Sequence, residues 1–148
     1  MRTPVFSGLI NTMEKKRVVA IIQARVGSMR LPGKVLRPLL GKPMLEHELE
    51  RIHGAKSIDV FIVATTEKPE DNPIADIAKR AGMHCFRGNE KDVLDRYYKA
   101  AKEANAETVV RITGDCPLHD PEVIDLVVKR FEERKVDYTI TPANFPEG

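Results

Sequence analysis

The sequence has 148 residues, of which 42% are hydrophobic and 31% charged, and its formal net charge is +2. A chain of this length corresponds to one domain with a substantial core. The near-neutral charge and the absence of tryptophan argue against a nucleic-acid partner, and no apolar run approaches the ~20 residues of a membrane span.

Runs of apolar residues predict strands, and apolar residues at intervals of three and four predict helices between them. In chain order we expect strand 18–23, helix 44–53, strand 59–64, a helix from about 74 to 81, strand 83–86, helix 92–104, strand 107–112, a helix after Asp120, and strand 136–141. Asp120 before Pro121 is typical of a helix start. Strands that alternate with helices favour parallel pairing with right-handed crossovers. The sequence therefore predicts a three-layer α/β/α fold on a mainly parallel sheet.

The most distinctive stretch, residues 23–34, follows the first predicted strand. It combines two glycines with three cations: Gly27, Gly33, Arg25, Arg30 and Lys34. No acidic residue occurs between positions 23 and 45. Glycines let backbone N–H groups approach a ligand closely, and fixed positive charge attracts an anion. The stretch therefore predicts a loop that holds a polyphosphate, with a solvent-exposed basic loop as the alternative.

Two familiar phosphate-binding motifs do not fit this loop. Walker A has four residues between its glycines and Ser or Thr after its lysine. Here five residues separate Gly27 from Gly33, and Val35 follows Lys34. The loop also contains no GxGxxG pattern. A different type of nucleotide site is expected.

A second loop, residues 113–119, follows the strand predicted at 107–112. It contains Asp115, preceded by Gly114 and followed by Pro117. A carboxylate at a strand end is a common ligand of Mg²⁺, which keeps its waters and substrate phosphates. Because ligands of parallel sheets bind at the carboxyl ends of the strands, the two loops together predict a nucleotidyl-transfer site. The alternative for Asp115 is a structural turn residue.

Three segments carry a resemblance to a known family. IIQARVGSMRLPGK at 21–34, with LGKPM at 40–44 and His47, is similar to the opening of the acid-sugar cytidylyltransferases. DVLDRY at 92–97 and ITGDCPL at 112–118 resemble the SpsF-like branch, which serves spore-coat polysaccharide biosynthesis. The family includes the enzymes that activate 3-deoxy-manno-octulosonate and sialic acids. The resemblance extends from about Val18 to the last residue, and it implies a Rossmann-like fold of the nucleotide-diphospho-sugar transferase type.

The resemblance implies transfer of CMP from CTP to an acidic sugar, with release of pyrophosphate. It implies catalysis by Arg25, Lys34 and Asp115, with Asp115 binding Mg²⁺. The two cysteines themselves are typical of reduced thiols in a cytoplasmic protein. The expected nucleotide contacts are Ala24, Arg25, Gly27, Ser28, Arg30, Lys34, Gly88, Asp92, Asp95 and Arg96. The residues themselves leave alternatives open, since Asp92 is also a natural helix N-cap and Asp95 with Arg96 could be an ordinary pair on a helix surface.

Relatives of this kind are longer, and their later part adds a second metal-binding aspartate and a dimerisation element. The resemblance therefore implies a homodimer and a chain shortened at its C-terminal end. Two other functions remain open: a non-catalytic nucleotide-binding or interaction module, and a nucleotidyltransferase for a sugar phosphate. We expect residues 1–16 to be a disordered extension and residues 17–148 to form the nucleotide-binding α/β domain. Cys85 and Cys116 are too few and too far apart for a disulfide framework or a zinc site.

Overall fold

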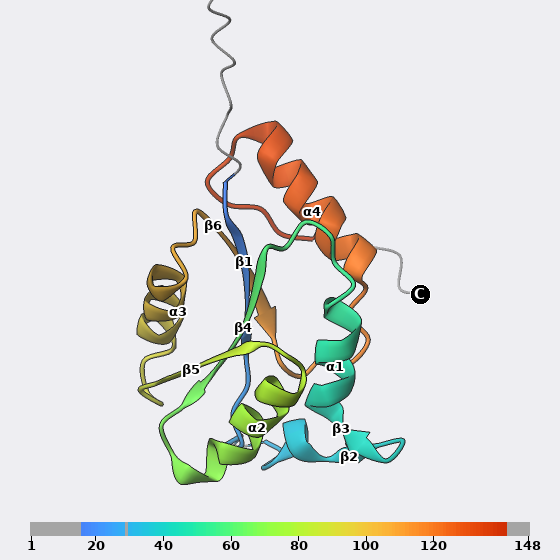
Figure 1. Ribbon diagram of the computed structural model, residues 1–148, viewed down its shortest axis with the longest axis vertical. Helices are drawn as coiled ribbons and strands as arrows, with labels where there is room; N and C mark the ends of the chain where they lie inside the picture. The colour runs from blue at the N-terminus through green and yellow to red at the C-terminus, as the bar shows by residue number, and fades with distance from the viewer. Residues whose placement is uncertain (1–15, 29, 142–148) are drawn as a thin grey trace, which may run out of the picture.

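The computed structural model describes residues 16–28 and 30–141 (Figure 1). Its main sheet contains four strands: β1 (Val18–Gln23), β4 (Val60–Thr66), β5 (His84–Gly88) and β6 (Thr108–Thr113). The helices that flank it are α1 (Met44–Ile52), α2 (Asn72–Arg80), α3 (Val93–Glu103) and α4 (Pro121–Arg134). The short elements are the hairpin strands β2 (Pro38–Leu39) and β3 (Lys42–Pro43), and the 3-10 turns η1 (Lys34–Leu36) and η2 (Pro69–Asp71).

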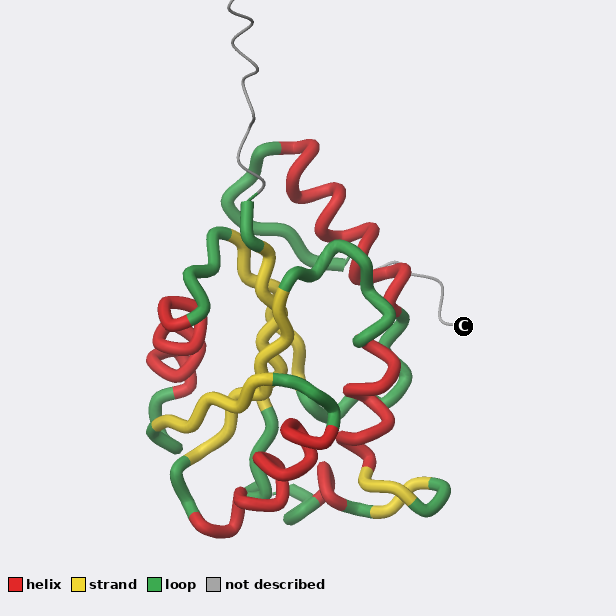
Figure 2. Tube along the Cα trace, in the orientation of Figure 1, coloured by secondary structure: helices red, strands yellow, loops and turns green. Residues whose placement is uncertain are grey.

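The helices cover both faces of the sheet, so the described part of the chain forms three layers. Alternate residues of β1 point to opposite faces. Val18, Ala20 and Ile22 pack against α1, α2 and α4, whereas Val19 and Ile21 pack against α3. Figures 1 and 2 show α3 alone on one side of the strands and the other three helices on the opposite side. β1 is buried on both faces, as its unbroken apolar sequence predicts.

The strand order is β5-β4-β1-β6, and all three pairings are parallel. From β1 the chain moves outward through β4 to β5, and it then crosses to the other side of β1 to form β6. The connection that follows β1 carries α1 on one face of the sheet, whereas the connection that leads into β6 carries α3 on the other face, so the winding reverses between β1 and β6. The register pairs Gln23 at the end of β1 with Thr113 at the end of β6. A crevice opens at such a point in α/β sheets, so the fold brings loops 24–34 and 114–119 together.

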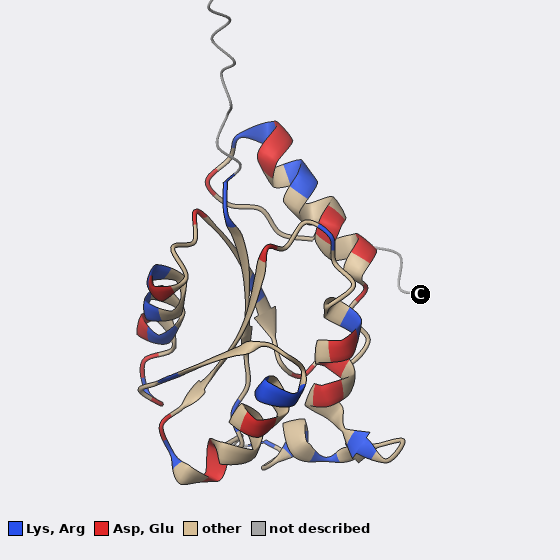
Figure 3. Cartoon of the chain, viewed as in Figure 1, with Lys and Arg blue, Asp and Glu red and all other residues tan. Residues whose placement is uncertain are grey.

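Most of the predicted elements are confirmed, with boundaries that differ by one or two residues. The strand at 18–23 is reproduced without change, and the predicted caps Asp92 and Asp120 both precede their helices. Both cysteines are free. Within residues 16–28 and 30–141, no helix is long and apolar enough to cross a membrane. Charges of both signs alternate along the helices (Figure 3), which agrees with the near-neutral total.

The strand predicted at 136–141 is wrong. The segment has no regular secondary structure and pairs with no strand of the described chain, and Tyr138 and Ile140 are exposed. Alternating apolar residues favour a strand only where a neighbouring strand supplies hydrogen bonds and a face to pack against. The β2–β3 hairpin was not predicted either, because its two-residue strands are too short to show a period. The predicted extension at 1–16 lies outside the described residues except for its last position.

Candidate nucleotide-binding site

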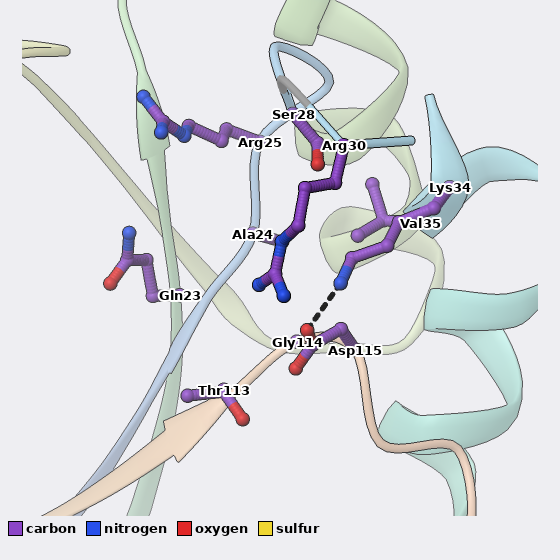
Figure 4. A pocket seen from close by; sticks show the side chains of 10 residues that line it. All are labelled: Gln23, Ala24, Arg25, Ser28, Arg30, Lys34, Val35, Thr113, Gly114 and Asp115. Carbon is purple, nitrogen blue, oxygen red and sulfur yellow. Dashed lines mark hydrogen bonds and ion pairs between the residues drawn. The ribbon is translucent and has the colours of Figure 1, made fainter. Parts of the chain in front are cut away.

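A cavity of about 310 Å³ opens where the loops after β1 and β6 meet (Figure 4). The lining residues come from those two loops and the adjoining strand ends: Gln23, Ala24, Arg25, Ser28, Arg30, Lys34, Val35, Thr113, Gly114 and Asp115. Three of them are cations and one is an anion. The structure therefore brings the predicted basic loop and the predicted carboxylate together in the wall of one cavity.

The basic loop is folded back on itself by backbone hydrogen bonds. The N–H groups of Ser28 and Gly33 both donate to the carbonyl of Val26, at 2.8 and 2.9 Å. Gly33 has a φ of 68°, the left-handed conformation that glycine adopts without steric cost, and it precedes η1. Lys34 opens η1, and the side chains of Lys34 and Arg30 reach toward Asp115 (Figure 4). The two cations thus face one side of the cavity.

Asp115 and Lys34 form the closest polar contact in the cavity. Lys34 Nζ donates to Asp115 Oδ2 at 2.5 Å. This hydrogen bond lowers the pKa of the Asp115 carboxyl, and Thr113 and Arg30 contribute in the same direction. The carboxylate therefore stays ionised over the whole physiological pH range. The ionised carboxylate can act as a metal ligand. Asp115 also lies in a turn, which is compatible with that function.

Gly114 allows the loop after β6 to pass against the end of β1. A Cβ atom at this position would lie 2.7 Å from the carbonyl oxygen of Gln23 and 2.9 Å from the Cβ of Ala24. The same approach lets the Gly114 N–H donate to the Gln23 carbonyl at 2.8 Å. Any side chain here would push Asp115 away from the basic loop, so glycine is required next to the carboxylate.

A buried carboxylate that the sequence analysis did not identify binds the backbone of the basic loop. Asp71 is 1% exposed, and its Oδ1 accepts the backbone N–H of Val26 at 2.7 Å. Its Oδ2 accepts a hydrogen bond from the Thr66 hydroxyl. Asp71 lies in a polar segment between a strand and a helix, and nothing local distinguishes it from a surface residue. Only its contact with residue 26 in the folded chain shows that Asp71 holds the basic loop.

Arg25 belongs to a second group of charges. Its side chain points away from Lys34 and Asp115 (Figure 4), and its Nη1 lies 3.8 Å from Glu90 Oε1. Glu90 also pairs with Lys68 at 2.7 Å, and Lys68 lowers the pKa of the Glu90 carboxyl. Both Glu90 and Lys68 line a second cavity, of about 370 Å³, at the carboxyl ends of β4 and β5. The Arg25–Glu90 pair thus lies between two cavities.

The predicted segment 88–96 lies beside this second cavity, and Gly88 is part of its wall. Arg96 is fully buried, so it is not the surface residue that the alternative interpretation of the Asp95–Arg96 pair required. Its Nη1 donates to the carbonyl of Asn89 at 2.5 Å, while Nε and Nη2 find no protein partner among the described residues. Desolvation lowers the pKa of this guanidinium. Direct contact of Arg96 with a nucleotide stays a prediction.

The remaining two predicted contacts lie at the start of α3. Asp92 caps the helix by accepting the N–H of Asp95 at 2.8 Å. The Asp95 carboxylate pairs with Lys99 at 2.8 Å, one turn later. The structure therefore explains both residues by helix stability, and it does not place either of them in the two cavities.

The described residues contain no cluster of three or more His, Cys, Asp or Glu side chains that could hold a metal ion alone. Mg²⁺ does not need such a cluster, because one or two carboxylates suffice when phosphates and waters fill the other positions. Asp115 offers one ionised carboxylate beside a cationic cavity, which fits one position of such a site. Asp115 therefore fits the role of a single protein ligand of Mg²⁺, in a site that phosphates and waters would complete.

Comparison with known proteins agrees with this geometry. Residues 19–145 match the family model described as cytidylyltransferase. The chain belongs to the cytidylyltransferase family. It is 37% identical to the spore coat polysaccharide biosynthesis protein SpsF of Bacillus subtilis over 126 residues. The aligned region makes up 82% of this chain and 52% of SpsF. The chain is 39% identical to the 3-deoxy-manno-octulosonate cytidylyltransferase of Anaeromyxobacter dehalogenans, over 79% of this chain and 48% of that enzyme.

Solved structures of the family share the fold. A cytidylyltransferase from Leptospira borgpetersenii superposes with a TM-score of 0.78 at 42% identity, covering 81% of this chain and 50% of the other. A CMP:2-keto-3-deoxy-manno-octonic acid synthetase solved with CTP superposes with a TM-score of 0.72 at 25% identity, over 82% and 49% of the two chains. The predicted fold class is therefore confirmed. The chain spans about half the length of the cytidylyltransferases it matches.

Proposed function

We propose that the protein binds CTP with Mg²⁺ in the cavity between β1 and β6 and takes part in transferring CMP to an acidic sugar. The observation that carries the proposal is the pairing of a cationic loop with the ionised Asp115 in the wall of a cavity of about 310 Å³. Membership of the cytidylyltransferase family supports the choice of CTP. The names of the relatives that act on 3-deoxy-manno-octulosonate support an acidic sugar as acceptor.

The proposed transfer of CMP has three steps. A sugar hydroxyl attacks the α-phosphorus of CTP, the bond to the β-phosphate breaks, and pyrophosphate leaves. Arg30 and Lys34 neutralise the charge that accumulates on the phosphate oxygens, and N–H groups of the folded loop can donate to the same oxygens. Asp115 would hold Mg²⁺, which would supply positive charge to offset the charge on the phosphates. Lys34 then exchanges its contact with Asp115 for a phosphate.

Thermal unfolding tests the binding step. CTP with Mg²⁺, at a concentration about 100-fold above its Kd, should raise the Tm of the 148-residue chain by about 5–10 °C. Lys34→Ala should remove this rise in Tm, because the positive charge at the start of η1 is lost. Lys42→Ala is the matched control, since Lys42 pairs with Glu50 instead of lining the cavity. Failure of CTP, ATP and GTP to bind at millimolar concentration would refute a nucleotide site.

Measurement of pyrophosphate release across acceptors separates the catalytic proposals. We expect release with an acidic sugar such as 3-deoxy-manno-octulosonate, and none with sugar 1-phosphates. Release with a sugar phosphate alone would assign the other acceptor class. CTP binding without release for any acceptor would identify a nucleotide-binding module, because the half-length chain would then hold the nucleotide without completing the reaction.

A further inference from the structure

The loop that carries Asp115 is tied to α1 by a buried carboxylate. Glu48 of α1 is fully buried, with 0% of its surface exposed. Its Oε2 accepts the backbone N–H of Cys116 at 3.1 Å, and its Oε1 lies 3.0 Å from Nδ1 of His119. A carboxylate accepts hydrogen bonds, and Nδ1 is the His119 nitrogen placed to donate one. Both partners of this carboxylate therefore belong to the same loop.

This arrangement is more than core packing. Glu48 lies between Leu45, Leu49 and Ile52, which are fully buried and form the apolar face of α1. A carboxylate in such a place costs free energy unless hydrogen bonds compensate it. The two bonds that do so exist only while the loop keeps its present conformation. The burial of Glu48 and the conformation of the loop thus depend on each other.

The consequence is that the backbone is fixed on both sides of Asp115. On the N-terminal side the N–H of Gly114 donates to Gln23 of β1 at 2.8 Å. On the C-terminal side the N–H of Cys116 donates to Glu48. A further bond joins Arg51 Nε of α1 to the carbonyl of His119 at 3.1 Å. Asp115 is held between these attachments and faces Lys34.

We infer that Glu48 and His119 form a positioning pair, which holds the Asp115 carboxylate where it shares a bound divalent cation with the nucleotide phosphates. The inference rests on the proposed function for its ligand, while the attachment of the loop is visible in the fold itself. Neither side chain lines the cavity, so the pair acts through the backbone of residues 114–116 and not by touching the substrate.

Glu48→Gln tests the pair with little change in shape. The Mg²⁺ concentration needed for half of the CTP-dependent rise in Tm should increase on the order of tenfold, as for other groups that orient a metal ligand. CTP affinity without Mg²⁺ should not change. Glu50→Gln is the matched control, because Glu50 lies on the same helix, is exposed, and contacts only Lys42 among the contacts described.

His119 gives an independent test that does not disturb the core. His119→Ala should reproduce the effect of Glu48→Gln, and the double variant should be no worse than Glu48→Gln alone, because both changes break one unit. His119→Asn should restore much of the Mg²⁺ response, since its amide can donate from nearly the position of Nδ1. Additive effects of the two single changes would contradict the pair.

A nuclear magnetic resonance measurement separates this inference from the proposed function. The amide proton of Cys116 should exchange slowly in the original chain and at least tenfold faster in Glu48→Gln or His119→Ala. This result needs no nucleotide. If the chain does not bind CTP, the proposed function fails while the exchange rate alone decides whether Glu48 holds the loop. If Glu48→Gln matches Glu50→Gln in both exchange and Mg²⁺ response, the positioning pair is refuted.

Discussion

The chemistry of the candidate site depends on a few side chains at the ends of two strands. Asp115 is the only carboxylate among the residues lining the first cavity, and Lys34 is its direct partner. Ion pairs at exposed positions contribute little to stability, about 0–1 kcal/mol. The pair therefore contributes little to the fold, and under the proposed function both members would exchange one another for metal and phosphate.

The lowered pKa of Asp115 leads to a prediction at this scale. Lys34→Gln should raise the pKa of the carboxyl toward its ordinary value of about 3.9, because the hydrogen bond from Lys34 is the main cause of the lowering. A group with a lowered pKa stabilises the fold above its ordinary pKa and loses that contribution as pH falls through the lowered value. Titration of the carboxyl ¹³C resonance measures the change. Lys42→Gln should leave this titration unaltered.

Gly114 provides a steric prediction. Gly114→Ala should destabilise the fold by about 1–3 kcal/mol, the usual cost of forcing extra atoms into a packed site, because the new Cβ would lie 2.7 Å from the Gln23 carbonyl oxygen. Denaturant unfolding measures the loss. Gly27→Ala is the control, since its Cβ would meet nothing closer than 3.4 Å. Equal stability of the two variants would show that the close approach is not needed.

At the scale of elements, the caps and the apolar periods of the helices follow from local sequence, and the hairpin does not. Leu40 joins β2 to β3 with a φ of 49°, a left-handed conformation that costs about 1–2 kcal/mol for an ordinary side chain. Its side chain is 92% exposed, so no burial offsets this cost. His47 of α1 holds the hairpin from the other side, with Nε2 2.6 Å from the Leu39 carbonyl.

Replacement of Leu40 should therefore stabilise the protein. Leu40→Asn should add about 0.5–1 kcal/mol to the free energy of unfolding, since asparagine tolerates left-handed angles better than leucine. Thermal unfolding measures the gain. Leu39→Asn is the control at the neighbouring position, where the backbone is extended and no gain is expected. A loss of stability in Leu40→Asn would mean that the leucine makes contacts that the fold needs.

At the scale of the whole molecule, helices cover both faces of the sheet, and β6 is its last strand on one side. Within residues 16–28 and 30–141, no strand pairs with the outer side of β6, and Val109 of that strand is 45% exposed. An uncovered strand edge is a template for pairing with another chain. The β6 edge therefore provides a surface on which copies of the chain could associate.

Association at this edge is a prediction about the whole molecule. The apparent mass of the 148-residue chain should increase with concentration in sedimentation or light scattering. Val109→Lys should weaken that association by at least tenfold, because a charge on an edge strand opposes pairing. Leu94→Lys is the control, as Leu94 is 79% exposed and belongs to α3 and not to the edge strand. A mass that is constant with concentration, or equal behaviour of both variants, would exclude the β6 edge.

The sequence alone determined the order of strands and helices, the parallel sheet, the cationic loop and the single carboxylate opposite it. Those features depend on periodicity, capping and local charge, which act over a few residues. Only the tertiary structure decided which buried carboxylates hold the two loops. Asp71 binds a backbone N–H 45 residues away, and Glu48 binds one 68 residues away. Burying such a charge is favourable only once the distant partner arrives, and neither the polar segment around Asp71 nor the place of Glu48 on the apolar face of α1 identifies that partner in the sequence.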